Sequence, residues 1–253
     1  YGANWVPIFD EQSTGSIGAI GVSASNPNVI YVGTGAGIIR PDLSIGDGVY
    51  KTTDGGKTWQ HLGLRDTQMI AAISVDATNP DRLFVAALGH PYGPNEERGV
   101  FRSTDGGRTF QKVLFKDAYT SANEVVIDPR NPNTVYAMLW SQQQSFIEGQ
   151  GFGNAGMGLF KSTDGGVTWN ELIGEQPAAS VGDIAIAPSN AEVVYVGTGE
   201  ANNRQSSSIG NGMYKTTDGG KTWSHIGLDD TQSIARVVVH PTNPDIVYVA
   251  AMG

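Results

Sequence analysis

An all-β fold of the β-propeller type is predicted by three features of this 253-residue sequence. A short pattern, Ser/Thr-x-Asp-x-Gly-x-Thr-Trp/Phe, recurs at intervals of about fifty to sixty residues, and self-similarity at this period is typical of repeat architectures, including propellers. The 34 glycines and 12 prolines favour many short strands joined by turns. No segment has a helical period of useful length. The four copies of the pattern are Thr52–Trp59, Ser103–Phe110, Ser162–Trp169 and Thr216–Trp223.

Each repeat is predicted to fold as one blade of four antiparallel strands. In the first, a strand over Ile17–Ser23 is followed by Asn26-Pro27-Asn28, a turn in which asparagine and proline occupy favoured positions. The apolar run Val29–Gly33 is the second strand, Gly48–Lys51 is the third and leads into the repeated pattern, and the fourth begins at Trp59. The blades expected on this basis are 17–64, 70–115, 123–173 and 181–228, with partial blade strands at 4–9 and 234–253.

A longer repeat of three blades is superimposed on this order. Ser16–Gly89 aligns without a gap with Ser180–Gly253, at an offset of 164 residues and with more than half of the positions identical. Trp5 and Trp169 obey the same offset, so residues 4–9 are interpreted as the last strand of a further blade. We therefore expect four complete blades plus partial blades at both ends, as a fragment of a larger ring. Further residues of the same polypeptide or another chain would complete it.

The repeated pattern itself is expected to be structural. Its aspartate can accept hydrogen bonds from the backbone of its own turn, its glycines can adopt positive φ, and its final aromatic ring can pack into a blade interface. The residues assigned to this role are Asp54, Trp59, Asp105, Phe110, Asp164, Trp169, Asp218 and Trp223.

The pattern resembles the Asp-box, or bacterial neuraminidase repeat, of sialidases, xyloglucanase-type glycosidases, sortilin-type receptors and photosystem II assembly propellers. Two longer segments, His90–Gly99 and Gly199–Ser208, resemble parts of large secreted bacterial sortilin-like repeat proteins that are often labelled glycosyl hydrolases. The resemblance implies a β-propeller fold and an extracellular or periplasmic location.

Composition excludes several classes of partner. Sixteen basic against 25 acidic side chains give a net charge of −9, which opposes the phosphate contacts that nucleic-acid binding requires. Cysteine is absent, which excludes disulfides and thiolate metal sites, and the four histidines show no close pairing. No apolar run is long enough for a membrane span. We expect no metal and no cofactor, and a peptide, protein or glycan as partner.

Candidate binding residues lie in the long polar loops between the second and third strands of the blades. The two copies of the long repeat keep the framework but differ at 36–42 and 200–206, as expected if these loops carry recognition. The candidates are Arg40, Asp42, His90, Tyr92, Asn95, Glu96, Glu97, Arg98, Glu200, Asn202, Asn203 and Arg204.

Several of these candidates have a simpler interpretation. Arg40 and Arg204 could bind a carboxylate or a glycan, but a salt bridge to a neighbouring acid is favoured. Glu96 and Glu97 could act in glycoside hydrolysis only if they faced each other across a sugar, which adjacent residues rarely do. A solvated loop is favoured for them. Asp66-Thr67-Gln68 recurs at 230–232 and is interpreted as a backbone cap.

The favoured function is a non-catalytic binding or scaffold propeller, because no nucleophile–base pattern is visible. A glycoside hydrolase of the Asp-box type is the first alternative, although neither the arginine triad and tyrosine of sialidases nor the acid pair of xyloglucanases can be mapped onto this sequence. An assembly factor for a larger complex is the second alternative, which rests on fold analogy alone.

Overall fold

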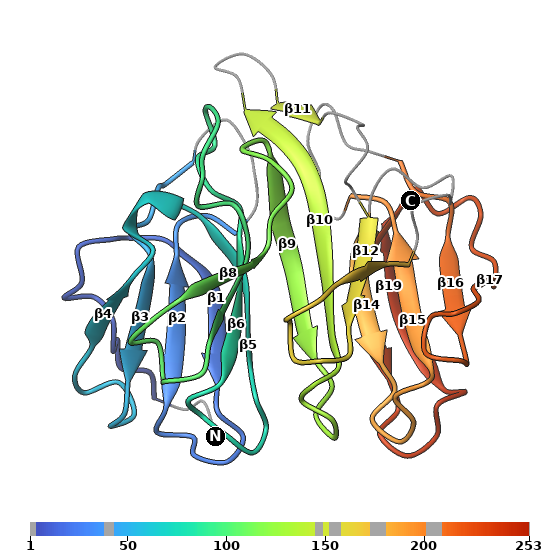
Figure 1. Cartoon of the computed structure of the whole chain (residues 1–253), viewed down its shortest axis with the longest axis horizontal. Coiled ribbons are helices and arrows are strands. Elements are labelled where there is room, and N and C mark those ends of the chain that lie inside the picture. Colours follow the sequence, from blue (N-terminus) through green and yellow to red (C-terminus); the bar gives the residue numbers. More distant parts are fainter. Residues whose placement is uncertain are drawn as a thin grey trace.

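The structure is a computed structural model that describes residues 4–37, 43–144, 149–151, 158–172, 181–200 and 209–252. Over these residues the chain forms five antiparallel sheets that follow one another in chain order (Figure 1). The described residues contain no α-helix and one short 3-10 turn, η1 (Arg65–Thr67). The predicted all-β propeller architecture is confirmed, with four complete blades followed by a two-stranded sheet.

Each blade runs from an inner first strand to an outer last strand. The first sheet has the order β1 (Ile17–Val22), β2 (Ile30–Thr34), β3 (Val49–Thr52) and β4 (Gln60–Gly63). The second consists of β5 (Ile70–Val75), β6 (Leu83–Ala87), β7 (Gly99–Ser103) and β8 (Gln111–Leu114). The fourth consists of β14 (Val181–Ile186), β15 (Val194–Thr198), β16 (Met213–Thr216) and β17 (Ser224–His225), and the last sheet of β18 (Ser233–Val239) and β19 (Val247–Met252).

The third sheet differs from the expected four strands. Its main path contains β9 (Thr120–Ile127), β10 (Val135–Gln144), β12 (Gly158–Ser162) and β13 (Asn170–Glu171). A fifth strand, β11 (Gly149–Gly151), pairs with the far end of β10, which is twice as long as the equivalent strand β2. The extra length of β10 therefore carries this blade beyond the common four-stranded unit.

The apolar core lies between the sheets, because each cluster of buried side chains draws on two consecutive blades. Continuous apolar strands such as β6 are fully buried, as expected for strands covered on both faces. Representative buried residues from the four interfaces are Tyr31 and Leu83, Phe84 and Val125, Met138 and Ile184, and Tyr195 and Val237.

Comparison of the two copies of the long repeat shows that, among the described residues, the outer faces of the first and last sheets have no neighbouring sheet packed on them. Phe84 is fully buried against the third blade, whereas Tyr248, 164 residues later, is 68% exposed on β19. Ile184 is 5% exposed against the third blade, whereas its counterpart Ile20 on β1 is 64% exposed. The same positions are thus core in one copy and surface in the other.

The repeated turns have the hydrogen bonds that the sequence predicts. The Asp54 carboxylate accepts bonds from the Thr58 hydroxyl at 2.7 Å, the Thr58 backbone N–H at 2.9 Å and the Lys57 N–H at 3.0 Å. These bonds, led by that of the Thr58 hydroxyl, hold the pKa of Asp54 well below its usual range. Gly55 and Gly56 have φ of 73° and 92°, which a residue with a Cβ adopts only with strain. The turn therefore closes on partners from its own eight residues.

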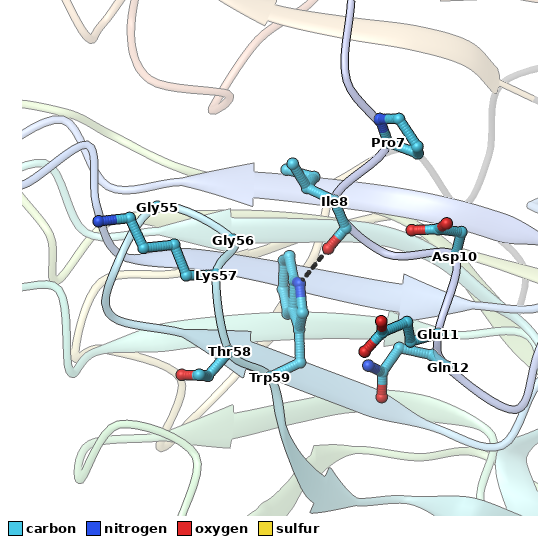
Figure 2. A pocket seen from close by; sticks show the side chains of 10 residues that line it. All are labelled: Pro7, Ile8, Asp10, Glu11, Gln12, Gly55, Gly56, Lys57, Thr58 and Trp59. Atoms are coloured by element: carbon cyan, nitrogen blue, oxygen red, sulfur yellow. Dashed lines mark hydrogen bonds between the residues drawn. The ribbon is translucent and has the colours of Figure 1, made fainter.

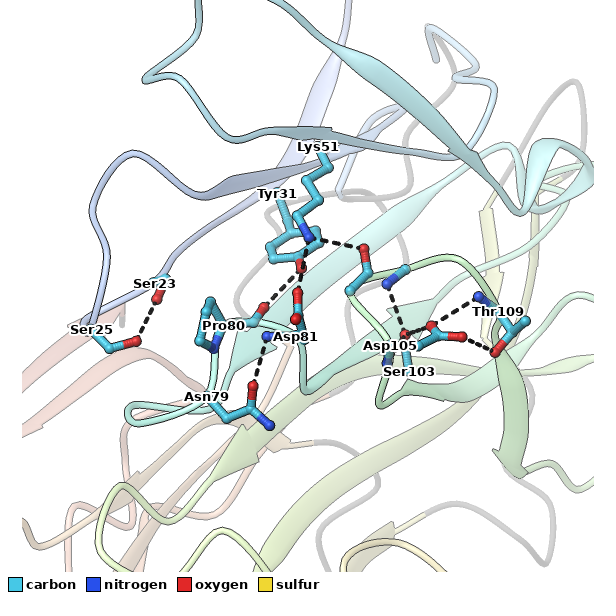
Figure 3. A network of polar contacts seen from close by, with 12 residues as sticks. Ser23, Ser25, Tyr31, Lys51, Asn79, Pro80, Asp81, Ser103, Asp105 and Thr109 are labelled. Atoms are coloured by element: carbon cyan, nitrogen blue, oxygen red, sulfur yellow. Dashed lines mark hydrogen bonds and ion pairs between the residues drawn. The ribbon is translucent and has the colours of Figure 1, made fainter.

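Neighbouring blades are tied together through the Asn-Pro turns. The Tyr31 hydroxyl donates to the Pro80 carbonyl at 2.8 Å, and Lys51 Nζ lies 3.2 Å from both Asp81 Oδ1 and the Gly106 carbonyl (Figure 3). The second copy repeats the contacts at 2.9 Å for Tyr195 with Pro244 and 3.0 Å for Lys215 with Asp245. The turns therefore fix the spacing between blades as well as the path within one.

Residues 4–9 consist of bends and irregular backbone where the sequence analysis expects a strand. Their packing nevertheless matches that of a last strand. A Cβ on Gly56 would lie 2.7 Å from Ile8 Cδ1, and a Cβ on Gly220 would lie 2.7 Å from Leu172 Cδ1 in the second copy. Ile8 and Leu172 are related by the 164-residue offset, so the repeat is visible in the contacts even without strand pairing.

Candidate functional site

The loops between β4 and β5 and between β6 and β7 lie against each other at one edge of the second blade. The Leu88 N–H donates to the Met69 carbonyl at 2.9 Å, and the Asn95 N–H donates to the Ala118 carbonyl at 2.9 Å. These backbone bonds join three connecting segments, so residues far apart in the sequence share one site.

Arg98 is the buried centre of this loop cluster. Its side chain is fully buried and donates to the carbonyls of His90 at 2.6 Å, Gly93 at 3.0 Å and Tyr119 at 3.0 Å. It also donates to the Ser121 hydroxyl at 2.7 Å. Burial lowers the pKa of Arg98 to about 10, which leaves it charged at neutral pH. The cation therefore fixes the 90–98 loop from within and acts as structure, where the sequence analysis proposed ligand binding.

Asp66 is presented by η1 and held by two side chains of the neighbouring loop. Its Oδ1 lies 3.0 Å from His90 Nε2, and its Oδ2 accepts a bond from Asn95 Nδ2 at 3.0 Å. Asn95 is 5% exposed, whereas the Asp66 side chain is 68% exposed. A buried amide thus orients an accessible carboxylate. The sequence analysis interpreted Asp66 as part of a backbone cap, and that role does not explain these two side-chain contacts.

Glu97 lies beside Asp66 in a different environment. Burial, followed by the charge of Asp66, raises the pKa of Glu97 above its ordinary value. Its Oε2 atom is buried and has no hydrogen-bond partner among the described residues. The backbone next to it is fixed, because the Thr67 hydroxyl donates to the Glu97 carbonyl at 2.7 Å. An exposed carboxylate and a partly buried carboxyl group with a raised pKa therefore adjoin each other in these loops.

The adjacent pair Glu96 and Glu97 does not form this arrangement. The Glu96 side chain is 79% exposed and its Oε2 lies 3.6 Å from Lys112 Nζ, so it points away into solvent. The partner of Glu97 is instead Asp66, about thirty residues earlier. Asp66 and Asp230 occupy the same turn in the two copies of the repeat. Nothing in the sequence indicated that Asp66 has the second acid Glu97 beside it.

The remaining candidates are dispersed or not described. Tyr92 is 41% exposed in the same loop as His90, and Glu200 is 5% exposed in the fourth blade, where its carbonyl accepts a bond from the Ser233 hydroxyl. Five candidates lie outside the described residues: Arg40, Asp42, Asn202, Asn203 and Arg204.

A second group of charges lies on the innermost strands. One register position, next to the irregularity in each strand ladder, carries Glu124 in β9, Asp183 in β14 and Arg236 in β18. The same position carries Ala19 in β1 and Ala72 in β5. Arg236 Nε lies 3.8 Å from Asp183 Oδ2, which also accepts the Val237 N–H at 2.6 Å. Burial, followed by the charge of Asp183, raises the pKa of Glu124 to about 7. No sequence pattern indicated this row.

Glu124 is expected to make stability depend on pH. Its pKa is raised from an ordinary 4.5 to about 7, so its contribution is greatest below pH 4.5 and is lost as the pH rises through 7. The difference amounts to about 3 kcal/mol of unfolding free energy. Urea unfolding at pH 5 and pH 8 should show this loss in the unaltered protein and a much smaller one in Glu124→Gln. The exposed Glu171→Gln is the control, and equal pH dependence in both variants would contradict the assignment.

Among the described residues, no group of three or more His, Cys, Asp or Glu side chains is placed to hold a metal ion. No helix in these segments is long and apolar enough to cross a membrane.

Comparison with known proteins finds a repeat family and several relatives. The BNR/Asp-box repeat family matches residues 50–61 and 214–225. Xyloglucanase Xgh74A of Acetivibrio thermocellus is 24% identical over 98% of this chain and 32% of its own length. A probable oligoxyloglucan-reducing end-specific xyloglucanase of Neosartorya fischeri is 27% identical over 76% of this chain and 24% of its own. The crystal structure of an ancestral GH74 enzyme superposes with a TM-score of 0.68 at 23% identity, covering 94% of this chain and 28% of that one.

These matches correct one expectation and confirm another. The sequence analysis favoured a non-catalytic binding propeller over a glycoside hydrolase. The relatives are xyloglucanases, so this ranking was wrong and the glycoside hydrolase alternative is favoured. The chain spans about a third or less of the length of these relatives. The repeated turns, the sheets and the matched segments agree: the chain carries BNR/Asp-box repeats on a β-propeller fold.

Proposed function

We propose that this chain forms part of a glycoside hydrolase that acts on a xyloglucan-type polysaccharide at the loops of the second blade. The observation that carries the proposal is the pair Asp66 and Glu97: an exposed carboxylate held by His90 and Asn95 lies beside a partly buried carboxyl group whose pKa is raised. The match to xyloglucanases over nearly the whole chain supports the choice of substrate class.

The pair fits the chemistry that glycoside hydrolysis requires. One carboxylic acid gives a proton to the leaving glycosidic oxygen, while a second carboxylate activates water or stabilises the positive charge at the sugar. Glu97, with its raised pKa, retains its proton to higher pH than an ordinary glutamate and suits the first role. Asp66, oriented by His90 and Asn95, is exposed and suits the second.

The same proposal assigns a location and a partner. A polysaccharide is too large to cross a membrane, so an enzyme that hydrolyses it works outside the cytoplasm, in the extracellular space or the periplasm. The partner is then a neutral glycan chain, which agrees with the net charge of −9 because such a ligand needs no basic surface.

An assay of reducing-sugar release tests the proposal directly. The full polypeptide that contains this chain should release oligosaccharides from xyloglucan in preference to starch or chitin. Hydrolysis of xyloglucan that disappears in the Asp66→Asn variant would support the site. An intact, folded protein that releases no sugar from any of the three polymers would contradict the proposed function.

A further inference from the structure

A hollow of about 630 Å³ lies away from the loop cluster, between the 7–12 segment and the repeated turn of the first blade (Figure 2). Its lining comes from two parts of the chain, residues 7–12 on one side and 55–59 on the other. The volume falls within the range of about 300–1,000 Å³ that is typical of small-molecule sites.

The indole of Trp59 is held in the wall of this hollow. Its Nε1–H donates to the Ile8 carbonyl at 2.6 Å, and the Phe9 ring packs edge-on against it with centroids 4.9 Å apart. Trp59 remains partly exposed, and Figure 2 shows its ring between the side chains of Asp10, Glu11 and Gln12 on one side and Lys57 on the other. A fixed aromatic surface loses little conformational freedom when a ligand stacks on it.

The polar groups around the ring suit a neutral polyhydroxylated ligand. Asp10 and Glu11 are exposed acceptors, and the amide of Gln12 can both donate and accept. A sugar ring has an apolar C–H face that stacks on an indole and hydroxyl groups at its edge that pair with carboxylates and amides. An anionic ligand would meet two carboxylates against the single cation of Lys57, so charge disfavours it.

The second copy of the repeat lacks two of these side chains. At the positions 164 residues after Phe9 and Asp10, the sequence has Ile173 and Gly174. Trp223 corresponds to Trp59, but its Nε1 atom is buried without a hydrogen-bond partner among the described residues. The repeat therefore supplies a tryptophan in the same turn without the surroundings that would make it a binding surface.

We propose that the hollow is a second carbohydrate-binding site, in which Trp59 stacks on a sugar ring of a neutral glycan and Asp10 and Gln12 bind its hydroxyl groups. The ligand class rests on the proposed function. The site lies away from Asp66 and Glu97 and takes no part in bond cleavage, so it would hold the polymer while the loops act on it.

Tryptophan fluorescence of the full polypeptide tests the site. The titration uses cellotetraose and a xyloglucan heptasaccharide, in a Glu97→Gln background so that the probe is not consumed. A saturable change in emission is expected, and it should be lost in Trp59→Phe and kept in the matched control Trp223→Phe. The double variant Asp10→Ala and Gln12→Ala should weaken binding at least tenfold without changing the melting temperature.

The outcomes separate this site from the proposed reaction. Fluorescence that responds equally in Trp59→Phe and Trp223→Phe, or no response to millimolar sugar, would overturn the second site even if xyloglucan is hydrolysed. A response that depends on Trp59 in a protein without hydrolytic activity would uphold the site and reject the catalytic role of Asp66 and Glu97.

Discussion

Replacing Glu97 by glutamine is expected to lower kcat for xyloglucan hydrolysis by about 10²–10⁴-fold, the usual contribution of a general acid. The amide keeps the size of the side chain but cannot release a proton to the glycosidic oxygen. In the unaltered protein, activity should fall at alkaline pH as Glu97, whose pKa is raised by burial and by Asp66, loses its proton. The residual rate of the glutamine variant should lack this alkaline decrease. Initial rates of reducing-sugar release between pH 4 and 9 measure both effects.

Two matched controls make this result specific. Glu96→Gln changes the neighbouring glutamate, which is 79% exposed, and should leave kcat and the pH profile unchanged. Asp66→Asn should also abolish most of the rate, whereas Asp230→Asn alters the equivalent turn of the other copy and should retain it. Equal rates for Glu97→Gln and Glu96→Gln would show that the raised pKa has no catalytic purpose.

Replacing Arg98 by methionine is expected to destabilise the protein by about 3–5 kcal/mol, because buried carbonyls that have lost their donor each cost about 1–3 kcal/mol. The guanidinium donates to three carbonyls and one hydroxyl, and methionine replaces none of these bonds. For a chain of this length the melting temperature should fall by about 10 °C.

Thermal unfolding followed by circular dichroism measures this loss. Arg108→Met, at an exposed position of a repeated turn, is the control and should change the unfolding free energy by less than about 0.5 kcal/mol. The activity of the Arg98→Met protein that remains folded should also fall. His90 and Asn95 lie on the loop that Arg98 fixes, and both orient Asp66. A stable Arg98→Met protein would mean that the loop is held by other contacts.

The parts of the fold that the sequence predicted are those whose causes are local. Asp54 finds its partners within four residues, so the repeated pattern is enough to specify the turn. The order of strands within a blade follows from the same short range, because consecutive antiparallel strands need only short connections. The extra strand β11 was not foreseen, since it depends on the unusual length of β10.

The candidate site was only partly foreseen. The length and polarity of the loops between second and third strands directed attention to the 90–98 loop, and His90, Asn95, Glu97 and Arg98 all lie in the described cluster. It did not show that Arg98 is buried structure, nor that the partner of Glu97 is Asp66. These facts depend on how one blade seats against the next, which no pattern within a repeat encodes.

The sequence by itself determined the repeat, the all-β class and the turn chemistry, because each depends on residues that are neighbours along the chain. Only the tertiary structure decided which charges meet. Asp66 reaches Glu97, and Glu124 reaches Asp183, because separate blades bring their loops and inner strands together. The raised pKa values of Glu97 and Glu124 follow from burial and proximity, which are properties of the packed blades and of no single segment.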